Sequence, residues 1–374
     1  MNALFLIFHG FDETNGISKK IRNQVKAFNE CGLDMRIFYY DILPDGNRRW
    51  MVDDEIVKNL GYGITAKLRK RYSYNAIFDY ILRENIKFVY IRSNHNANPF
   101  TIQMVRKIKS YGAKVVMEIP TYPYDQEYTS KPMKLKLFVD CIFRYRLAKH
   151  LDSIITFSNE KYIFGKATIR ISNGIDFNSI PLKKQINDTR IEMHLLGVAE
   201  IHYWHGYDRL ISGLANYYRN NPAYKVYFHI VGPIVGEKEK QKILPIIYKN
   251  GLESYVKLHG PLQGIALDKC FEQADFAIGS LGRHRSGITN IKTLKNREYA
   301  ARGIAFTYSE TDEDFDNMSY VWKVPPDESP IDIKKLIDFQ CSIKITPQDI
   351  RQTVKELSWV VQMKKVINEM GIIV

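Results

Sequence analysis

The sequence predicts an α/β protein of two doubly wound domains, and three observations support this fold class. Short apolar runs alternate with longer amphipathic stretches along the whole chain. This alternation favours parallel sheets covered by helices on both faces, because parallel strands need a crossover that is usually a helix. The pattern restarts near the middle of the chain, and 374 residues suit two domains of roughly 100–200 residues each.

The first half contains six predicted strands, which cover Ala3–Phe8, Met35–Tyr40, Phe88–Ile91, Val115–Ile119, Ile154–Phe157 and Ile169–Ile171. Apolar residues recur at three- and four-residue spacing between them, which predicts helices over Ser18–Asn29, Ala76–Glu84 and Pro99–Ser110. We therefore expect an N-terminal doubly wound domain over residues 1–172.

The second half repeats the pattern, with predicted strands at Ile191–Val198, Lys225–Val231, Val256–His259, Phe276–Ile278 and Ala305–Tyr308. Predicted helices cover Tyr207–Arg219, Glu237–Asn250, Ala266–Gln273 and Leu294–Arg302. Residues 173–189 are rich in Asn, Asp, Lys and Pro and are the predicted linker. The C-terminal domain then covers residues 190–346, and residues 347–374 form a final segment that is amphipathic over Pro347–Glu369.

The charge is strongly positive, with 54 Lys and Arg against 41 Asp and Glu, or +13. Such an excess is typical of proteins that bind nucleic acid, an anionic membrane or an anionic substrate. Most of it lies in residues 1–180, which carry 28 Lys and Arg against 18 Asp and Glu. No nucleic-acid recognition motif is present, so nucleic acid is the weakest of the three partners.

The four cysteines lie far apart and predict no disulfide scaffold or metal site, and we expect them to be reduced. No apolar stretch approaches the roughly 18–20 residues that cross a bilayer. The composition also excludes a disordered or collagenous protein. We expect a cytoplasmic protein that associates with the inner face of the cytoplasmic membrane.

Two basic clusters lie in the first half, at Lys67–Tyr72 and at Lys131–His150. In the second cluster, basic residues are mixed with Leu, Ile and Phe on a predicted helix. This mixture is typical of a surface for anionic lipid headgroups. A core helix with a solvated outer face would have the same composition, so the sequence leaves both interpretations open.

The loops that follow the strands are the candidate binding segments, because ligands of open parallel sheets bind at the carboxyl ends of the strands. The loop His9–Gly16 enters a helix at Gly16 and suits either an anion or a plain turn. The segment after Val115–Ile119 contains Glu118, Thr121, Tyr122 and Tyr124. Its rings and carboxylates suit a sugar or another polar acceptor, or a rigid surface loop.

The segment Gly279–Gly303 has the richest chemistry. Its loop contains Arg283, His284 and Arg285, and the first turn of the following helix contains Lys295 and Arg297. Because cations are disfavoured at a helix N-terminus, this pattern indicates a neighbouring polyanion such as a pyrophosphate, or else a solvated basic loop.

Neither of two possible metal motifs predicts a metal site. His202 and His205 lack the third ligand that zinc requires. Asp312–Asp316 contains an Asp-x-Asp pattern that we interpret as a solvated acidic turn.

Four landmarks, taken together and in order, resemble the retaining glycosyltransferases of the GT-B fold, in the family 4-like group that includes bacterial polysaccharide-assembly enzymes. They are Ser172–Asp176, His205–Ile211, His259–Leu262 and Glu298–Ile304. The first resembles the Asn-Gly-Ile-Asp that enters the interdomain linker. The second resembles the Lys-Gly-x-Asp-x-Leu-Ile of the donor domain, and the last resembles the end of a motif with two glutamates separated by seven residues.

The resemblance implies two Rossmann-like domains that face a cleft, with a C-terminal helix that crosses back to the N-terminal domain. It implies that the nucleotide-sugar donor binds the C-terminal domain and that Glu298 holds the ribose. Backbone amides near Ile291–Leu294 would lie beside the phosphates, and the Gly16 loop would approach the transferred sugar. It also implies transfer with retention, without a metal or cofactor, from a UDP- or GDP-sugar to a glycan or lipid-linked saccharide in cell-surface polysaccharide synthesis.

Three positions depart from the family pattern. Asn290 replaces the first glutamate of the pair, and Glu200 and His205 replace the phosphate-binding Arg and Lys. Our hypothesis is that Arg283, Arg285 and Lys295 hold the diphosphate instead.

The predicted site residues form three groups. The catalytic group is Asn290, Glu298 and Glu118; the donor-binding group is Gly16, His205, Gly206, Arg283, His284, Arg285, Lys295 and Glu298; the acceptor-binding group is Thr121, Tyr122 and Tyr124. Three other functions remain open: a catalytically weakened GT-B protein that binds sugar or a partner enzyme, a GT-B sugar-nucleotide epimerase, and a nucleic-acid-binding protein.

Overall fold

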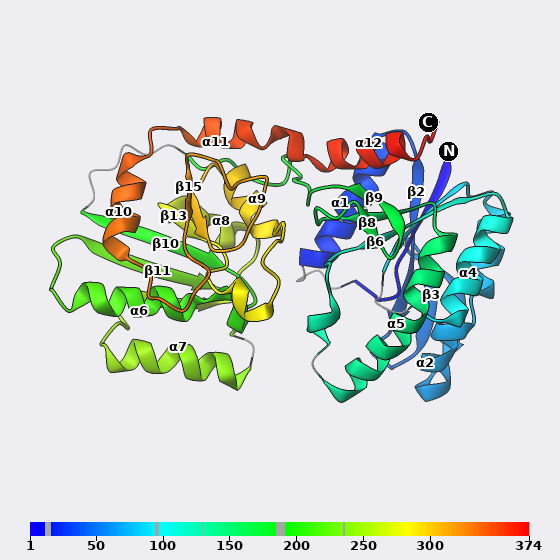
Figure 1. The fold of residues 1–374 in the computed structure, drawn as a ribbon, viewed down its shortest axis with the longest axis horizontal. Helices are drawn as coiled ribbons and strands as arrows, with labels where there is room; N and C mark the ends of the chain where they lie inside the picture. Colours follow the sequence, from blue (N-terminus) through cyan, green and yellow to red (C-terminus); the bar gives the residue numbers. More distant parts are fainter. Residues whose placement is uncertain (12–15, 94–96, 129, 185–190, 235, 374) are drawn as a thin grey trace. The chain divides into compact units, whose positions relative to one another are not determined.

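The chain folds into two compact units (Figure 1). The computed structural model describes residues 1–11, 16–93, 97–128, 130–184, 191–234 and 236–373. Unit 1 contains Met1–Gly174 and Trp359–Val374, and unit 2 contains Ile175–Ser358. The described part of the predicted linker beyond Gly174, residues 175–184, belongs to unit 2. There the guanidinium of Arg351 donates to the carbonyl oxygens of Phe177 and Ile180 at 2.7 and 2.9 Å.

Unit 1 is built on a mixed sheet. Among the described residues its strand order is β4-β3-β2-β1-β5-β6-β7-β9-β8. The strands are β1 (Asn2–Leu6), β2 (Asp34–Ile42), β3 (Arg48–Val52), β4 (Glu55–Gly61), β5 (Phe88–Arg92), β6 (Lys114–Ile119), β7 (Ser153–Thr156), β8 (Tyr162–Ile163) and β9 (Lys166–Arg170). The central strands are parallel, as predicted.

Both edges of this sheet differ from the prediction of parallel strands alone. β3 and β4 are antiparallel to their neighbours, as is β8 to β9. Antiparallel strands can be joined by two-residue turns, and Asp53–Asp54 forms such a turn between β3 and β4, with Asp53 at a φ of 48°. These short connections leave no room for the crossover helices that the sequence argument required.

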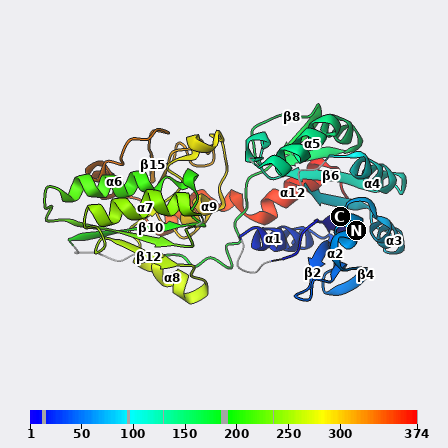
Figure 2. The same ribbon diagram turned by 90° about the horizontal axis from the view of Figure 1, so that it is seen from below.

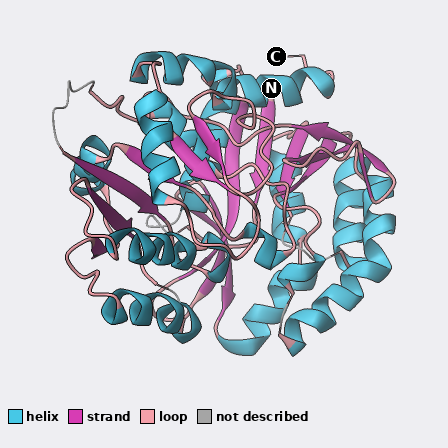
Figure 3. Ribbon diagram, turned by 60° about the vertical axis from the view of Figure 1, so that its left-hand side comes forward, coloured by secondary structure: helices cyan, strands magenta, loops and turns pink. Residues whose placement is uncertain are grey.

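Helices cover both faces of the unit 1 sheet (Figure 3). They are α1 (Gly16–Glu30), α2 (Gly63–Tyr72), α3 (Asn75–Arg83), α4 (Pro99–Ser110), α5 (Lys131–His150) and α12 (Trp359–Glu369). α1 and α12 share one apolar cluster with the sheet, and α3, α4 and α5 contribute to the other. No helix in the described part of the chain has both the length and the apolar character to cross a bilayer.

The C-terminal segment returns to unit 1, which confirms the expected crossing helix. α12 lies beside α1, and its Trp359 is only 3% exposed (Figure 1). A Cβ on Gly174 would lie 2.2 Å from the Trp359 ring, so this contact requires glycine. The segment is not one helix, however. α11 (Pro347–Thr353) packs in unit 2, and a 3-10 turn at Lys355–Leu357 separates it from α12.

Unit 2 is built on a parallel sheet with the order β12-β11-β10-β13-β14-β15 among the described residues. Its strands are β10 (Glu192–Val198), β11 (Lys225–Val231), β12 (Val256–Gly260), β13 (Phe276–Ile278), β14 (Phe306–Tyr308) and β15 (Val321–Lys323). Its helices include α6 (Tyr207–Tyr218), α7 (Glu237–Lys249), α8 (Gly264–Gln273), α9 (Leu294–Ala301) and α10 (Ile333–Ser342). α6 and α7 lie on one face of the sheet and α8 lies on the other (Figure 2).

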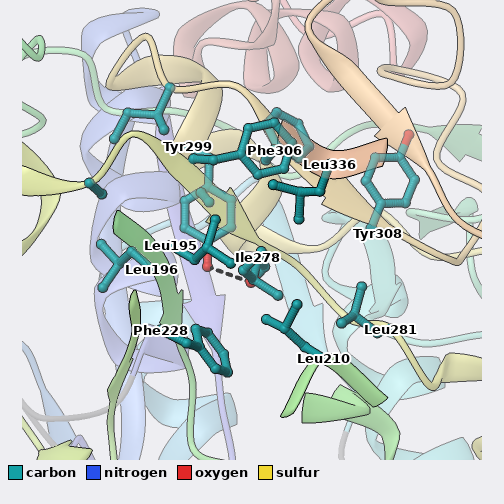
Figure 4. Packing of buried hydrophobic residues seen from close by; sticks show 14 of the residues in the cluster. Leu195, Leu196, Leu210, Phe228, Ile278, Leu281, Tyr299, Phe306, Tyr308 and Leu336 are labelled. Atoms are coloured by element: carbon teal, nitrogen blue, oxygen red, sulfur yellow. Dashed lines mark hydrogen bonds between the residues drawn. The ribbon is translucent and has the colours of Figure 1, made fainter. Parts of the chain in front are cut away.

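The order of strands in unit 2 reverses between β10 and β13, because β11 and β12 extend to one side of β10 and β13 to β15 extend to the other. Tyr299 of α9 holds this point together from the core (Figure 4). Its hydroxyl donates to the carbonyl oxygen of Ile278 at 3.1 Å and accepts from the Val198 N–H at 3.3 Å. The last residues of β10 and β13 are therefore fixed to each other, and the predicted doubly wound α/β fold class is confirmed.

Candidate functional site

The loops that follow β10 and β13 lie side by side at the reversal point of unit 2, where open α/β sheets bind ligands. Leu281 N–H donates to the carbonyl oxygen of His205 at 2.8 Å, and Gly282 N–H donates to that of Trp204 at 3.2 Å. Gly206 has a φ of 63°, and a Cβ there would lie 2.5 Å from the Gly282 nitrogen. Only glycine at position 206 allows this approach.

His205 lies in this contact as a neutral hydrogen-bond donor. Its side chain is buried, and its Nδ1 accepts a hydrogen bond from the His202 N–H at 2.9 Å. Burial, reinforced by the positive charges of Lys295 and Arg283, lowers the pKa of His205 well below its usual value. The proton of the neutral ring is therefore on Nε2, which can donate to a ligand.

Lys295 and Glu310 form a buried pair of ionisable groups beside His205. The Lys295 ammonium is buried and has no hydrogen-bond partner among the described residues, and neither carboxylate oxygen of Glu310 has one in another described residue. Burial lowers the pKa of Lys295 and raises that of Glu310. The charge of Arg283 acts on both groups, and its guanidinium lies 5.4 Å from the centre of the Trp204 ring.

The N-terminus of α9 completes this cluster. The residue that precedes the helix, Thr293, makes no capping hydrogen bond, and its hydroxyl is buried without a partner among the described residues. The side-chain oxygen of Asn290 is in the same state. Buried polar atoms are rarely left unsatisfied, and the first N–H groups of a helix attract anions. The arrangement suits a bound anion with several oxygen atoms.

Arg285 and His284 have a different role from the predicted one. Arg285 donates to both oxygens of Asp208 at 2.8 Å and to Glu328, and its Nη1 also donates to the Tyr203 carbonyl. His284 lies 2.7 Å from Glu328. The bond from Arg285 lowers the pKa of Glu328 to about 2. These partners already neutralise Arg285, whereas no such ion pair is found for the Lys295 ammonium among the described residues.

The Asp312–Asp316 segment is an ion-paired anchor, and its interpretation as a solvated turn was wrong. Asp312 is fully buried and accepts from Arg297 at 2.9 Å, and Asp314 also accepts from Arg297. Asp316 accepts from Tyr308 at 2.8 Å and from Lys323 at 2.7 Å. The cation of Arg297 in the first turn of α9 is thus explained by acidic partners.

The remaining predicted donor residues lie in both units. The Oε1 atom of Glu298 accepts from Arg302 at 3.0 and 3.1 Å, and the Glu298 side chain is 31% exposed. Gly16 is the first residue of α1 in unit 1. The part of the His9–Gly16 loop at residues 12–15 lies outside the described residues.

The predicted acceptor segment lies in unit 1. Thr121 and Tyr122 are half-buried, and Tyr124 is buried and donates to Asp140 at 2.6 Å. Glu118 is fully buried and accepts from Gln24 and Tyr90, each at 2.7 Å.

Glu118 also forms ion pairs with Arg92 and with Lys20, the latter at 3.4 Å. Despite its burial, these partners lower the pKa of Glu118. Its carboxylate is therefore ionised and saturated by its neighbours. Across the described residues, no group of three His, Cys, Asp or Glu side chains is placed to hold a metal ion.

Solved structures with the same architecture decide the fold. The chain matches sucrose-phosphate synthase from Thermosynechococcus elongatus with a TM-score of 0.69, at 12% identity over 99% of both chains. It matches HepE from Anabaena, solved with UDP and glucose, with a TM-score of 0.63, at 13% identity over 100% of both chains. The chain has the GT-B fold.

A third match agrees with this GT-B assignment. The catalytic domain of starch synthase IV from Arabidopsis thaliana, bound to ADP and acarbose, has a TM-score of 0.64, at 12% identity over 99% of this chain and 98% of that one. Neither a family model nor a curated protein matches the sequence. At these identities the likeness establishes the GT-B fold and leaves the activity to be argued from the site.

Glu310 is the member of the cluster that the sequence analysis missed. It follows β14 in a run of polar residues, and nothing in its sequence spacing distinguishes it from the exposed members of that run, Thr311 and Glu313. Its 1% exposure is the feature that marks it.

The Arg285 network generates a stability prediction. Arg285→Ala removes the shared partner of Asp208 and Glu328, so we expect the free energy of unfolding to fall by about 1–3 kcal/mol. Urea unfolding measures this change, and Lys269→Ala on the exposed face of α8 is the matched control. Unchanged stability together with lost nucleotide binding would return Arg285 to the predicted clamp.

Proposed function

We propose that this protein is a glycosyltransferase that transfers a sugar from a nucleotide-sugar donor to a glycan or lipid-linked saccharide. One observation carries the proposal: in a GT-B chain, Lys295, Arg283 and the uncapped start of α9 gather at the reversal point of the unit 2 sheet. The buried Lys295 ammonium and Thr293 hydroxyl, which have no partner among the described residues, suit a diphosphate. The sequence landmarks support a UDP- or GDP-sugar and a role in cell-surface polysaccharide synthesis.

Departure of the nucleoside diphosphate builds negative charge on its oxygen atoms. The N–H groups at the start of α9, the Lys295 ammonium and the His205 Nε2–H are fixed donors that can stabilise this charge. An anion beside Lys295 also favours the protonated amine, which burial otherwise opposes. This chemistry requires no metal ion, and we infer retention of the anomeric configuration from the resemblance to the family.

Two further residues complete the donor site in this proposal. Glu298 lies one helical turn beyond Lys295 on α9, and its partly exposed carboxylate can accept hydrogen bonds from ribose hydroxyls. The unsatisfied side-chain oxygen of Asn290 can accept one from a sugar hydroxyl. We assign Glu118 a positioning role in unit 1, because its four polar partners occupy its carboxylate.

Asn290 also favours a second candidate, a GT-B protein that has lost catalysis and only binds sugar or a partner enzyme. An amide cannot supply the negative charge of the glutamate that it replaces. Release of UDP from UDP-glucose by the purified protein, even if slow, would exclude this candidate.

The surface of unit 1 supports contact with an anionic membrane as part of the proposed function. α5 is 20 residues long and buries only Asp140, Leu147 and Ala148. An exposed stripe follows one side of it, formed by Leu135, Phe138, Ile142 and Tyr145, each more than half exposed. Lysines and arginines flank this stripe, and such a surface binds the interface of anionic bilayers.

The donor site yields a binding prediction that separates function from stability. We expect Lys295→Met to weaken UDP binding by about 10–100-fold, the effect of losing one charge-assisted hydrogen bond. The same change removes a buried, unpaired ammonium, so the free energy of unfolding should stay equal or rise. Isothermal titration and urea unfolding measure the two quantities.

Lys269→Met is the control for this change, since Lys269 is an exposed lysine of the same unit.

UDP affinity should also fall from about pH 7 to about pH 9. Both Lys295, with its lowered pKa, and Glu310, with its raised pKa, lose a proton as the pH rises, and each loss makes the site more negative. Equal UDP affinity in Lys295→Met and the parent would remove Lys295 from the donor site.

The exposed stripe of α5 predicts binding to vesicles. We expect co-sedimentation with vesicles that contain phosphatidylglycerol and little with pure phosphatidylcholine. The double variant Phe138→Ser, Ile142→Ser should weaken it at least about tenfold, because two apolar side chains no longer enter the interface. Ile265→Ser, at an exposed apolar residue of α8, is the control. Equal binding by both variants would contradict a role for α5.

A further inference from the structure

Unit 1 contains a cavity of about 760 Å³ that has no part in the proposed donor site of unit 2. It lies where the strand order of the unit 1 sheet reverses, between the segment after β1 and the end of β5, and Phe8 and Ile91 line it there. This is the unit 1 equivalent of the donor position in unit 2. Ligand cavities have volumes of about 300–1,000 Å³, so the size of this cavity suits a small-molecule ligand or a segment of a longer ligand.

The interior of the cavity is apolar. Its lining includes the buried side chains of Met104, Met117, Ile119, Leu147 and Ile154, from α4, β6, α5 and β7. None of the first nine residues of α5 is buried, and only Met133 and Leu137 of this half pack against the apolar cluster, so this half of the helix forms a wall of the cavity. Apolar cavities bind apolar groups in preference to water, and flexible methionines suit a chain without fixed shape.

The buried carboxylate of the lining, Asp140, is already bonded, whereas the Nε of Arg144 has no hydrogen-bond partner among the described residues. Asp140 accepts hydrogen bonds from the Tyr124 hydroxyl at 2.6 Å and from the Ala97 N–H at 2.7 Å. The predicted acceptor residue Tyr124 is therefore part of the cavity wall, with its hydroxyl turned to Asp140. Apolar side chains are nevertheless the larger part of the surface that a ligand would meet inside.

The charged side chains of the lining that reach solvent are mostly cations, with Glu127 as an acidic residue among them. Lys70 and Arg71 of α2 and Lys136 of α5 line the cavity, and no ion pair joins any of the three to a described acidic residue. The Lys70 ammonium lies 4.3 Å from the centre of the Tyr40 ring. Burial and then the charges of Arg71, Arg48, Lys136 and Lys67 lower the pKa of Lys70 to about 8. An anion at this position would relieve the repulsion.

Exposed apolar side chains continue the cavity to the surface. Phe100 and Leu135 line it and are 48% and 67% exposed. Leu135 is also the first residue of the exposed stripe on α5. An apolar path therefore runs from the surface proposed to contact the membrane to the interior of unit 1.

We propose that this cavity binds the hydrocarbon chain of a lipid phosphate, with the phosphate held by Lys70, Arg71 and Lys136 at the opening. If the protein is the proposed glycosyltransferase, the lipid is the carrier of the acceptor saccharide. This assignment of the ligand as acceptor rests on the proposed function. Neither the cations nor the apolar interior would select a lipid phosphate alone. Together they match it, because the cations correspond to its phosphate and the apolar interior corresponds to its hydrocarbon chain.

Binding of alkyl phosphates tests the proposal without membranes. Octyl, decyl and dodecyl phosphate are titrated below their critical micelle concentrations, with inorganic phosphate and dodecanol as single-feature probes. Each added methylene should raise the affinity about fourfold, equivalent to ~0.8 kcal/mol. Inorganic phosphate and dodecanol should each bind at least about tenfold more weakly than dodecyl phosphate. Affinity that does not depend on chain length would overturn the proposal.

Two variants address the two ends of the ligand. Lys136→Glu should weaken dodecyl phosphate at least about tenfold and leave dodecanol unchanged. Lys134→Glu, an exposed lysine of α5 that does not line the cavity, is the matched control. Met104→Trp should fill the cavity and weaken both probes. Because Met104 is buried, thermal unfolding is used to check that Met104→Trp still folds. If Met104→Trp does not fold, the comparison of Lys136→Glu with Lys134→Glu tests the proposal.

Titration with UDP separates this proposal from the proposed function. Chain-length-dependent binding of alkyl phosphates without any binding of UDP would support the cavity and contradict the donor site. Binding of UDP with no such chain-length dependence would do the reverse. Equal effects of Lys136→Glu and Lys134→Glu would show that phosphate binding is non-specific and would overturn the placement of the phosphate.

Discussion

The close backbone contact between Gly206 and Gly282 is the constraint on which the unit 2 site depends. It allows the loops after β10 and β13 to share hydrogen bonds, and it places His205 beside Arg283 and Lys295. A side chain at position 206 would separate these loops. The Arg285 bonds to Asp208 and Glu328 then fix the second loop from outside. The positions of the two loops are thus determined by a backbone contact and by ion pairs. In our proposal none of these groups contacts the ligand.

The two cations in the first turn of α9, Arg297 and Lys295, differ in whether they have ion-pair partners. Arg297 is buried and paired with Asp312 and Asp314, so it contributes to the folded state. The ammonium of Lys295, two residues earlier, is buried and has no hydrogen bond to any described residue, although the charge of Glu310 acts on it. Groups left unsatisfied in the free protein usually mark function, because selection maintains them despite their cost in stability. This contrast within one helical turn is the strongest argument for a bound anion at Lys295.

Sequence patterns predicted the elements whose information is local. β11, β13 and α4 begin and end at the predicted residues, because apolar runs and the Asn98 cap mark them within the chain. The role of Arg285 could not be predicted, since its partner Glu328 lies 43 residues further on. The burial of Asp312 and Glu310 likewise depends on α9 packing over them. β3 and β4 were missed because an edge hairpin with polar residues lacks a strong apolar run. The fold therefore followed from periodicity, whereas the site depended on long-range contacts.

We propose that unit 2 binds the diphosphate of a nucleotide at the loops after β10 and β13 and at the start of α9. Hydrogen exchange of backbone amides with and without UDP tests it most directly, because it reports where the ligand binds rather than whether it binds. We expect slower exchange within residues 201–206, 280–285 and 293–296 in the presence of UDP, with the α5 segment of unit 1 unchanged. Unchanged exchange in these three segments, with slower exchange confined to unit 1, would contradict it.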